Sequence, residues 1–509
     1  MYFSPILIFS VSIIFTWVIL HLIGKKYALD IPDLRKRHVS TIPQIGGLVF
    51  GPLLLLIAWW LGLAPGWYLI CGMVSILLGA IDDFRHIPWQ VKLTVQLILT
   101  AYIATIFWDS FNIITFYNYS FPVTPIFLLA IFLFWFVGVY NAVNLLDGLD
   151  GLASGFMVLV CICAASAGNE AFALLNFVLA LLLIGFLVFN QRPAKLFMGD
   201  AGSLFLGFHI AVMPLLFVKS LPFSTTLNTT PFVLLASYLV ADTTRVFFSR
   251  MIDKKNPMTA DTIHFHHVIL QESGSYLVSI GSIFIVTLIT SLFSFLSFFN
   301  LLSVNFMLGH LALLLFFILM PPIQTYVPLL TRLVKPFYSW QSDHETKSPF
   351  LPRTIFIVFL LIGMLASLFF YCDIFRVFQW QNILGILLLL AFVLFYPKDK
   401  MVTYVIQLGL VILIAEVTWG AKIGTFTKLF SILLFVSYII FIVEERLGSD
   451  IRKFSALDLL MILFTIGGIV LSNLGFSFSI WFSLILFSIW FGLGFVLCRT
   501  AYFTSTATH

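Results

Sequence analysis

The chain has 509 residues, of which 61% are hydrophobic and 10% are charged. Soluble globular proteins are about 45–50% apolar and about 25% charged, so this composition excludes a soluble protein and indicates a surface that faces lipid. The formal net charge of +5 is small, and no nucleic-acid partner is expected. Five cysteines lie in or beside apolar segments without metal or disulfide spacing, and we interpret them as small buried apolar residues.

Apolar segments of about 20 residues, the length with which an α-helix crosses a bilayer, recur along the chain. The first, Ile6 to Ile23, lacks a basic N-terminal region and a small-residue cleavage site, so we interpret it as a spanning helix and not a signal peptide. The expected fold is an all-α polytopic membrane protein with about 17 transmembrane helices. The predicted spans lie near residues 4–23, 45–63, 66–81, 89–107, 122–141, 152–168, 171–189, 201–218, 231–249, 276–298, 303–326, 353–371, 380–396, 402–419, 425–443, 456–473 and 477–498.

Lys and Arg residues gather in the loops on one side of these spans. By the positive-inside rule, those loops are cytoplasmic, which places the N-terminus outside and the C-terminus inside. The opposite loops hold little more than Lys219, Arg376 and Lys422. Ionisable residues on the inner side are dense up to Ser275 and scattered beyond it. We therefore expect a membrane domain of about 11 helices with the candidate chemistry, residues 1–325, and an extension of about six helices, residues 326–509, with no assigned role.

Two basic residues, Arg37 and His38, follow the first span and precede the second. They could receive a phosphate at the membrane interface, or they could be part of the positive-inside signal. Asp82 and Asp83 then lie at the inner end of the third span. Adjacent carboxylates at a helix C-terminus repel each other and oppose the helix dipole, so they need a metal ion, a metal–diphosphate complex or Arg85 nearby. The alternative is a solvated helix end.

The segment from Asn141 to Leu152 joins the fifth and sixth spans. Asp147 and Asp150 would share a face if the segment were helical, and the intervening glycines would let a ligand approach the backbone. Asn144 adds an amide that can donate and accept, as recognition of a nucleobase or a sugar amide requires. A simple turn is the alternative, but the doubled acidic pattern favours a binding function.

Asp200 lies just before the eighth predicted span, between Gly199 and Ala201. It could cap the helix N-terminus, where free N–H groups can bind phosphate, and it could hold a bridging Mg²⁺. These two roles are compatible. Further along, Asp242 and Arg245 are spaced for an ion pair on one helix.

Three of the ten histidines fall within the segment Asp261–His267. His264 and His267 would share a helical face, while His266 would point elsewhere. A zinc site is the obvious alternative, but neither cysteines nor an HExxH pattern accompany the cluster. In a basic loop, phosphate binding or charge stabilisation is the better interpretation.

Four of these motifs lie in a fixed order on one membrane side: Asp82–Asp83, Asn141–Leu152, the segment around Asp200, and Asp261–His267. Together they resemble the polyprenyl-phosphate N-acetylhexosamine-1-phosphate transferases, and in particular the WecA-like branch of the glycosyltransferase 4, or MraY-like, superfamily. The resemblance covers about residues 1–275. One departure is Thr262, which stands where that branch usually has an arginine. The resemblance implies these roles: catalytic for Asp82, Asp83, His264, His266 and His267; substrate-binding for Lys92, Asn144, Asp147, Asp150 and Asp261; metal-binding for Asp200. Arg37 and His38 are also expected to bind substrate, as the phosphate entry site described above.

The implied reaction moves an N-acetylhexosamine 1-phosphate, by default GlcNAc-1-phosphate, from a UDP-sugar to polyprenyl (undecaprenyl) phosphate and releases UMP. This reaction would begin lipid-linked polysaccharide synthesis of the O-antigen, enterobacterial-common-antigen or teichoic-acid type at the cytoplasmic face of a bacterial inner membrane. Mg²⁺ is the expected cofactor, with Mn²⁺ as the alternative, and the expected partners are the two substrates, membrane lipid and, as one option, a second copy of the chain. The alternative function is a lipid-linked sugar flippase or secondary transporter. A transporter should carry polar groups near the bilayer midplane, for which only His209, His310 and Glu416 are candidates.

Overall fold

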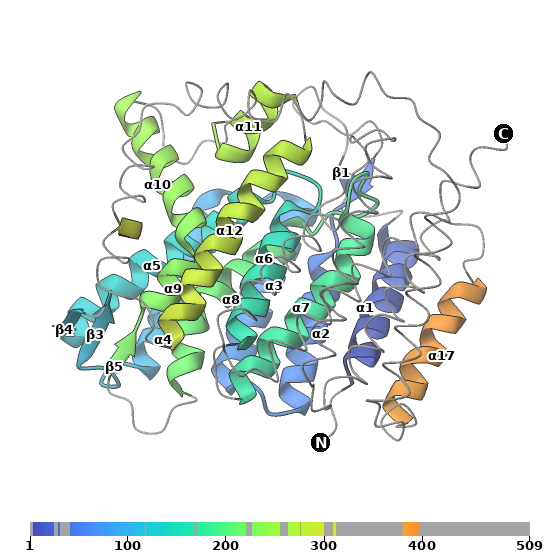
Figure 1. The fold of residues 1–509 in the computed structure, drawn as a ribbon, viewed down its shortest axis with the longest axis horizontal. Coiled ribbons are helices and arrows are strands. Elements are labelled where there is room, and N and C mark those ends of the chain that lie inside the picture. Colours follow the sequence, from blue (N-terminus) through green and yellow to red (C-terminus); the bar gives the residue numbers. More distant parts are fainter. Residues whose placement is uncertain are drawn as a thin grey trace, which may run out of the picture. The chain divides into compact units, whose positions relative to one another are not determined.

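The computed structural model describes residues 4–24, 29–30, 41–117, 119–166, 170–219, 226–254, 263–274, 276–299, 309–311 and 380–395 (Figure 1). Within these ranges, seven helices are long and apolar enough to cross a membrane: Pro5–Leu22, Gly66–Arg85, Trp89–Ile106, Pro125–Leu146, Glu170–Asn190, Gly199–Val218 and Val278–Phe298. The expectation of an α-helical polytopic membrane protein is therefore confirmed. Six of the predicted spans fall wholly or mostly outside the described residues, at 303–326, 353–371, 402–419, 425–443, 456–473 and 477–498.

The chain divides into two compact units. One comprises residues 15–325, and the other comprises residues 1–14 together with 326–509. The second unit includes most of helix α1 (Pro5–Ile19) and helix α17 (Trp380–Phe395). All the chemistry described below belongs to the unit of residues 15–325.

The helices of this unit agree closely with the predicted spans. They are α2 (Gly47–Trp60), α3 (Gly66–Arg85), α4 (Trp89–Ile106), α5 (Pro125–Leu146), α6 (Leu152–Ser166), α7 (Glu170–Asn190), α8 (Gly199–Lys219), α9 (Thr230–Leu235), α10 (Ser237–Ile252), α11 (Phe265–Ser273) and α12 (Tyr276–Phe298). The predicted span near 231–249 is instead two helices, because the chain breaks at Ala236 between α9 and α10.

Short strands, which the sequence analysis did not anticipate, lie in the connections. β1 (Leu29–Asp30) pairs antiparallel with β2 (Ile42–Pro43). The hairpin of β3 (Ile113–Phe116) and β4 (Tyr119–Pro122) adds β5 (Thr226–Asn228) parallel to β3. The β-branched and aromatic residues of the hairpin suit extended backbone, and pairing satisfies the polar groups of a segment next to the bilayer. Figure 1 shows this small sheet at the opposite end of the unit from α11.

Helix α8 is the centre of the bundle. It is almost wholly buried and packs chiefly against α3 and α5. Small residues make this possible, because apolar lipid offers no hydrophobic drive and close backbone approach must supply the packing energy. A Cβ on Gly79 of α3 would lie 2.3 Å from the backbone N of Ala201, and one on Gly207 would lie 2.4 Å from the backbone O of Tyr140. These contacts fix the N-terminus of α8 beside the C-terminal turns of α3.

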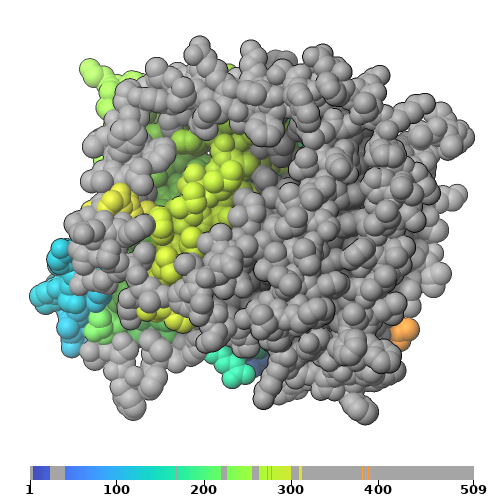
Figure 2. Space-filling view, in the orientation of Figure 1, coloured from blue at the N-terminus to red at the C-terminus, as the bar shows by residue number. Residues whose placement is uncertain are grey.

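Helix α12 lies on the surface of the unit, and its side chains form a diagonal yellow-green band in the space-filling view (Figure 2). Ile285, Val286 and Ile289 are exposed apolar residues on this helix. An exposed apolar stripe of this kind is expected on a helix that faces hydrocarbon.

An apolar cavity of about 470 Å³ lies beside the β3–β5 sheet, between the far ends of α5 and α8 and the short helix α9. Its lining is almost entirely aliphatic and aromatic, with Thr229 as the polar exception, and it contains no ionisable group. This cavity therefore lacks the groups that phosphate chemistry requires.

We predict that Gly79→Ala lowers the unfolding temperature in detergent, because its methyl group would collide with the backbone of α8 and not with a movable side chain. Overpacking of this kind costs about 1–3 kcal/mol. Gly66→Ala, on the same helix, is the matched control, since nothing lies within 4 Å of its added Cβ. Equal unfolding temperatures for the two variants would contradict the close α3–α8 packing.

Candidate functional site

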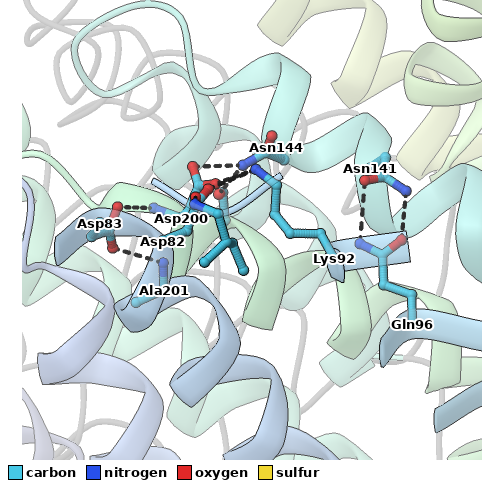
Figure 3. A network of polar contacts seen from close by, with 10 residues as sticks. Asp82, Asp83, Lys92, Gln96, Asn141, Asn144, Asp200 and Ala201 are labelled. Carbon is cyan, nitrogen blue, oxygen red and sulfur yellow. Dashed lines mark hydrogen bonds and ion pairs between the residues drawn. The ribbon is translucent and has the colours of Figure 1, made fainter. Parts of the chain in front are cut away.

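Four helix ends bring polar side chains together at one end of the bundle (Figure 3). The Lys92 ammonium on α4 lies 2.6 Å from Oδ2 of Asp82 on α3 and 3.0 Å from Oδ2 of Asp200 on α8. Asn144 on α5 donates from Nδ2 to Oδ1 of Asp200 at 3.0 Å and to Oγ of Ser203 at 2.8 Å. Residues far apart in sequence thus form one network, in which both carboxylate oxygens of Asp200 have partners.

Asp82 is a buried carboxylate that also organises the end of α3. Its Oδ1 accepts a hydrogen bond from the backbone N–H of Ile87 at 2.6 Å, while its Oδ2 accepts from Lys92. The helix ends at Arg85, so this bond holds the turn that leads into α4. Asp82 therefore directs the start of α4 so that Lys92 faces the network.

Asp83 has a different environment from its neighbour. Its two carboxylate oxygens accept hydrogen bonds from the backbone N–H groups of Asp200, at 2.7 Å, and Ala201, at 3.0 Å. Gly199 has a φ of +69°, and a Cβ there would lie 2.6 Å from Asp83 Oδ2. Asp83 thus caps α8 from another helix, and the interpretation of Asp200 as the cap is wrong: Asp200 lies in the first turn of α8.

A pair of amides braces the two helices that carry Lys92 and Asn144. Gln96 on α4 and Asn141 on α5 exchange hydrogen bonds of 3.2 Å and 2.8 Å (Figure 3). Reciprocal amide pairing fixes the relative rotation of the helices, because rotation of either helix breaks both of these hydrogen bonds. This pair was not predicted from the sequence, although Gln96 lies one helical turn after Lys92 and therefore on the same face of α4.

The segment between α5 and α6 is a turn, so the helical arrangement considered for Asp147 and Asp150 is not formed. Oδ2 of Asp150 accepts from the backbone N–H of Ala194 at 3.1 Å, and its backbone carbonyl accepts from the Tyr276 hydroxyl. Asp150 therefore ties the turn to the loop before α8 and to α12. Burial, followed by the negative charges of Asp200 and Asp150, raises the pKa of Asp147 to about 7.

The histidines lie against the same turn. His264 immediately precedes α11, and His266 and His267 lie in its first turn, with ring centroids 6.0 Å apart for His264 and His266 and 4.1 Å apart for His266 and His267. A Cβ on Gly148 would lie 2.5 Å from Nε2 of His266, so a side chain there would displace the His266 ring. Burial is the main cause that lowers the pKa of His266 to about 3, which leaves this ring neutral.

His264 is held by α10. Its Nδ1 lies 2.9 Å from Oδ2 of Asp242, whose Oδ1 accepts from Arg245 at 2.8 Å. The expected ion pair between Asp242 and Arg245 is therefore present, and its contact with the histidine motif was not predicted. Arg37, His38 and Asp261, and also Thr262, lie outside the described residues.

The carboxylate network suits a small divalent cation. Among the described residues no group of three or more His, Cys, Asp or Glu side chains is arranged to hold a metal. Mg²⁺, however, usually takes only one or two protein carboxylates and completes its shell with water and substrate phosphates. Asp82 and Asp200 already converge on a cation, the Lys92 ammonium, and both offer carboxylate oxygens as metal ligands. The donor set therefore fits Mg²⁺ or Mn²⁺ and gives no support to zinc.

We predict that Asp83→Asn destabilises the protein more than Asp82→Asn. Asparagine offers one acceptor to the two N–H groups at the start of α8, and its NH₂ would oppose the second, at a cost of about 1–3 kcal/mol. In Asp82→Asn, Lys92 keeps Asp200 as a partner. Thermal unfolding of the two purified variants measures the difference. A fully stable Asp83→Asn protein that has lost only activity would show that Asp83 acts directly in the chemistry.

The raised pKa of Asp147 predicts a pH-dependent stability. Because the folded protein holds this proton up to about pH 7 and the ordinary pKa is 3.8, the free energy of unfolding should fall as pH rises through that interval and level off above it. As the pH of a metal-free buffer rises from about 4 to about 7, the unfolding temperature should therefore decline less for Asp147→Asn than for wild type, by a few degrees. The exposed Asp109→Asn is the control, and identical declines in all three proteins would contradict the prediction.

Comparison with known proteins agrees with this geometry. Residues 66–218, which run from α3 to α8 and contain the whole carboxylate network, match the model of glycosyl transferase family 4. A probable undecaprenyl-phosphate N-acetylglucosaminyl 1-phosphate transferase of Bacillus subtilis is 31% identical over 296 residues, which are 55% of this chain and 80% of the relative. An undecaprenyl-phosphate alpha-N-acetylglucosaminyl 1-phosphate transferase of Thermotoga maritima is 29% identical over 267 residues, 52% of this chain and 81% of the relative.

A phospho-N-acetylmuramoyl-pentapeptide-transferase of Lactobacillus johnsonii is similar over a shorter stretch, with 37% identity over 196 residues, 34% of this chain and 61% of the relative. The motifs, their convergence at one end of the bundle and the extent of these matches lead to the same result. The chain belongs to glycosyl transferase family 4 and, within it, to the polyprenyl-phosphate N-acetylhexosamine-1-phosphate transferases.

Proposed function

We propose that this protein transfers an N-acetylhexosamine 1-phosphate, by default GlcNAc-1-phosphate, from a UDP-sugar to undecaprenyl phosphate and releases UMP. The observation that carries the proposal is the network in which Lys92 joins Asp82 to Asp200 while Asn144 holds the other oxygen of Asp200. The names of the relatives from Bacillus subtilis and Thermotoga maritima support the acceptor and the transferred group.

The reaction needs charge neutralisation more than it needs a strong base. The phosphate monoester of the lipid carrier has a second pKa of about 6, so it is mostly a dianion at neutral pH. One of its oxygens attacks the β-phosphorus of the UDP-sugar, and the bond from that phosphorus to the bridging oxygen breaks and leaves its electron pair on UMP. Both reactants are anions, so positive charge and hydrogen-bond donors at the point of attack lower the barrier.

The described residues can supply these functions in separate ways. Lys92 provides a positive charge between Asp82 and Asp200, and Asn144 provides a directed N–H donor. Asp83 holds the first turn of α8, which fixes the place of the Asp200 carboxylate. Asp200, with Asp82, would hold Mg²⁺ or Mn²⁺, which supplies Lewis-acid stabilisation of diphosphate oxygens when bound. Asp147 and the histidines at the start of α11 would contact the nucleotide and the diphosphate.

The topology proposed for this function retains the predicted orientation. The N-terminus lies outside, about 17 helices cross the inner membrane of a bacterium, and the network opens to the cytoplasm. Catalysis belongs to residues 1–325, and residues 326–509 are an extension with no assigned chemistry. A homodimer is not part of the proposal.

Within the described residues, no observation favours the transporter alternative. Two of its three candidate groups are members of buried hydrogen-bond networks that satisfy them. His209 bonds Tyr68 at 2.7 Å and Asn176 at 3.1 Å, and His310 bonds the hydroxyls of Tyr117 and Ser237. Polar groups paired in this way between helices stabilise a membrane bundle and need no transport role. Glu416 lies outside the described residues.

We predict that membranes containing the protein convert UDP-[³H]GlcNAc, undecaprenyl phosphate and Mg²⁺ into a labelled lipid with stoichiometric UMP. Asp200→Asn should lower kcat at least about 100-fold, because it removes one negative charge from the cation-binding pair. Chelation of divalent ions should abolish turnover, and Asp109→Asn, on the opposite side of the bundle, should leave it unchanged. Absence of UMP release from a panel of UDP-N-acetylhexosamines would refute the proposed function.

A further inference from the structure

A buried cluster of charged side chains joins α10 to α11. Asp242 and Arg245 on α10 and His264 at the start of α11 are each at most 9% exposed. Asp242 accepts from Arg245 and from the backbone N–H of Phe265 through Oδ1, and it bonds His264 Nδ1 through Oδ2. Arg245 also donates to the carbonyl of Ile263 at 2.7 Å and lies over the Phe265 ring. The carboxylate is therefore the centre of the cluster.

This arrangement determines how His264 is presented. A carboxylate can only accept, so the hydrogen bond requires a proton on Nδ1 of His264. Arg245 already balances the charge of Asp242, so the cluster does not require a second proton on the ring. A neutral ring that donates from Nδ1 has its lone pair on Nε2, because the partner of one ring nitrogen sets the state of the other.

Nε2 of His264 is buried and has no hydrogen-bond partner in the part of the chain that the structure describes. Both ring nitrogens of the stacked His266 are in the same condition. A buried unpaired polar atom costs about 1–3 kcal/mol, so three of them together at a family motif indicate that a ligand completes their bonding. The His266 ring stacks on His264 and lies against Gly148, the residue that follows Asp147 in the turn between α5 and α6.

We propose that Asp242 is a positioning residue of the transferase site: together with Arg245 it fixes His264 in the Nδ1–H tautomer, so that Nε2 accepts a hydrogen bond from an O–H or N–H group of the UDP-sugar. This inference rests on the proposed function. The alternative is a purely structural clamp that holds α11 on α10 and would act equally with any tautomer. The two roles differ in one respect: a positioning residue affects the reaction only when His264 is present, whereas a structural clamp affects it with or without His264.

The first test is a double-mutant cycle on UMP release. Asp242→Asn can keep the shape of the contact, but its amide can donate to Nδ1 and so stabilise the wrong tautomer. Because the lost hydrogen bond is made to the bound UDP-sugar, we expect kcat/KM to fall about tenfold, with most of the change in KM. In a His264→Gln background, the same substitution should cost little more, because the two residues act as one unit. Asp253→Asn, the same chemical change at the exposed residue that follows α10, is the control.

Two results would overturn the inference. One is a double variant whose loss of activity equals the product of the two single losses, as for independent residues. The other is full activity in Asp242→Asn. A second measurement needs no folded Asp242 variant. ¹⁵N spectra of histidine-labelled wild-type protein, compared with His264→Gln, assign the His264 ring: a proton on Nδ1 alone supports the inference, and a proton on Nε2 contradicts it. This spectrum reports on the tautomer even if no UDP-sugar is turned over, so failure of the proposed function is distinguished from failure of this inference.

Discussion

The ion pairs of Lys92 with Asp82 and Asp200 are the interaction on which the rest of the site depends. Carboxylates at helix ends near a bilayer are costly to bury unless a cation accompanies them. By placing one ammonium between two carboxylates, the chain joins α3, α4 and α8 at a single point. Asn144 adds α5 to the same point through Asp200. The network thus provides both the local packing and a position where a cation is favoured, which is what transfer between two phosphates requires.

The bundle supports this network through small residues and one unusual cap. Gly79 allows the backbone of α8 to approach α3, and Asp83 then occupies the N–H groups that would otherwise be free at the start of α8. The adjacent acids Asp82 and Asp83 therefore have different tasks: one faces the cation, and the other fixes the helix that carries Asp200. At the neighbouring turn, Gly148 leaves room for His266, which brings the histidine motif to the same end of the unit.

Much of the fold followed from the sequence because a bilayer constrains it strongly. Apolar length predicts helices such as α7 and α8 to within two residues, and acids at helix ends identify Asp82 and Asp200. The break at Ala236 and the β3–β5 sheet were not predicted, since neither disturbs the apolar pattern. Partners distant in sequence were also missed. Nothing local to Asp83 shows that its carboxylate caps α8, and the spacing of Asp242 and Arg245 suggested an isolated ion pair and not a support for His264.

An experimental structure with UDP-GlcNAc and Mg²⁺ tests the central claim most directly. We expect the metal on the Asp200 carboxylate at about 2.0–2.1 Å, with the diphosphate within hydrogen-bonding distance of Asn144 and Lys92. We also expect nucleotide contacts at the turn that contains Asp147. A nucleotide bound at the other end of the bundle, beside the β3–β5 sheet, or a metal held without Asp200, would rule out this site.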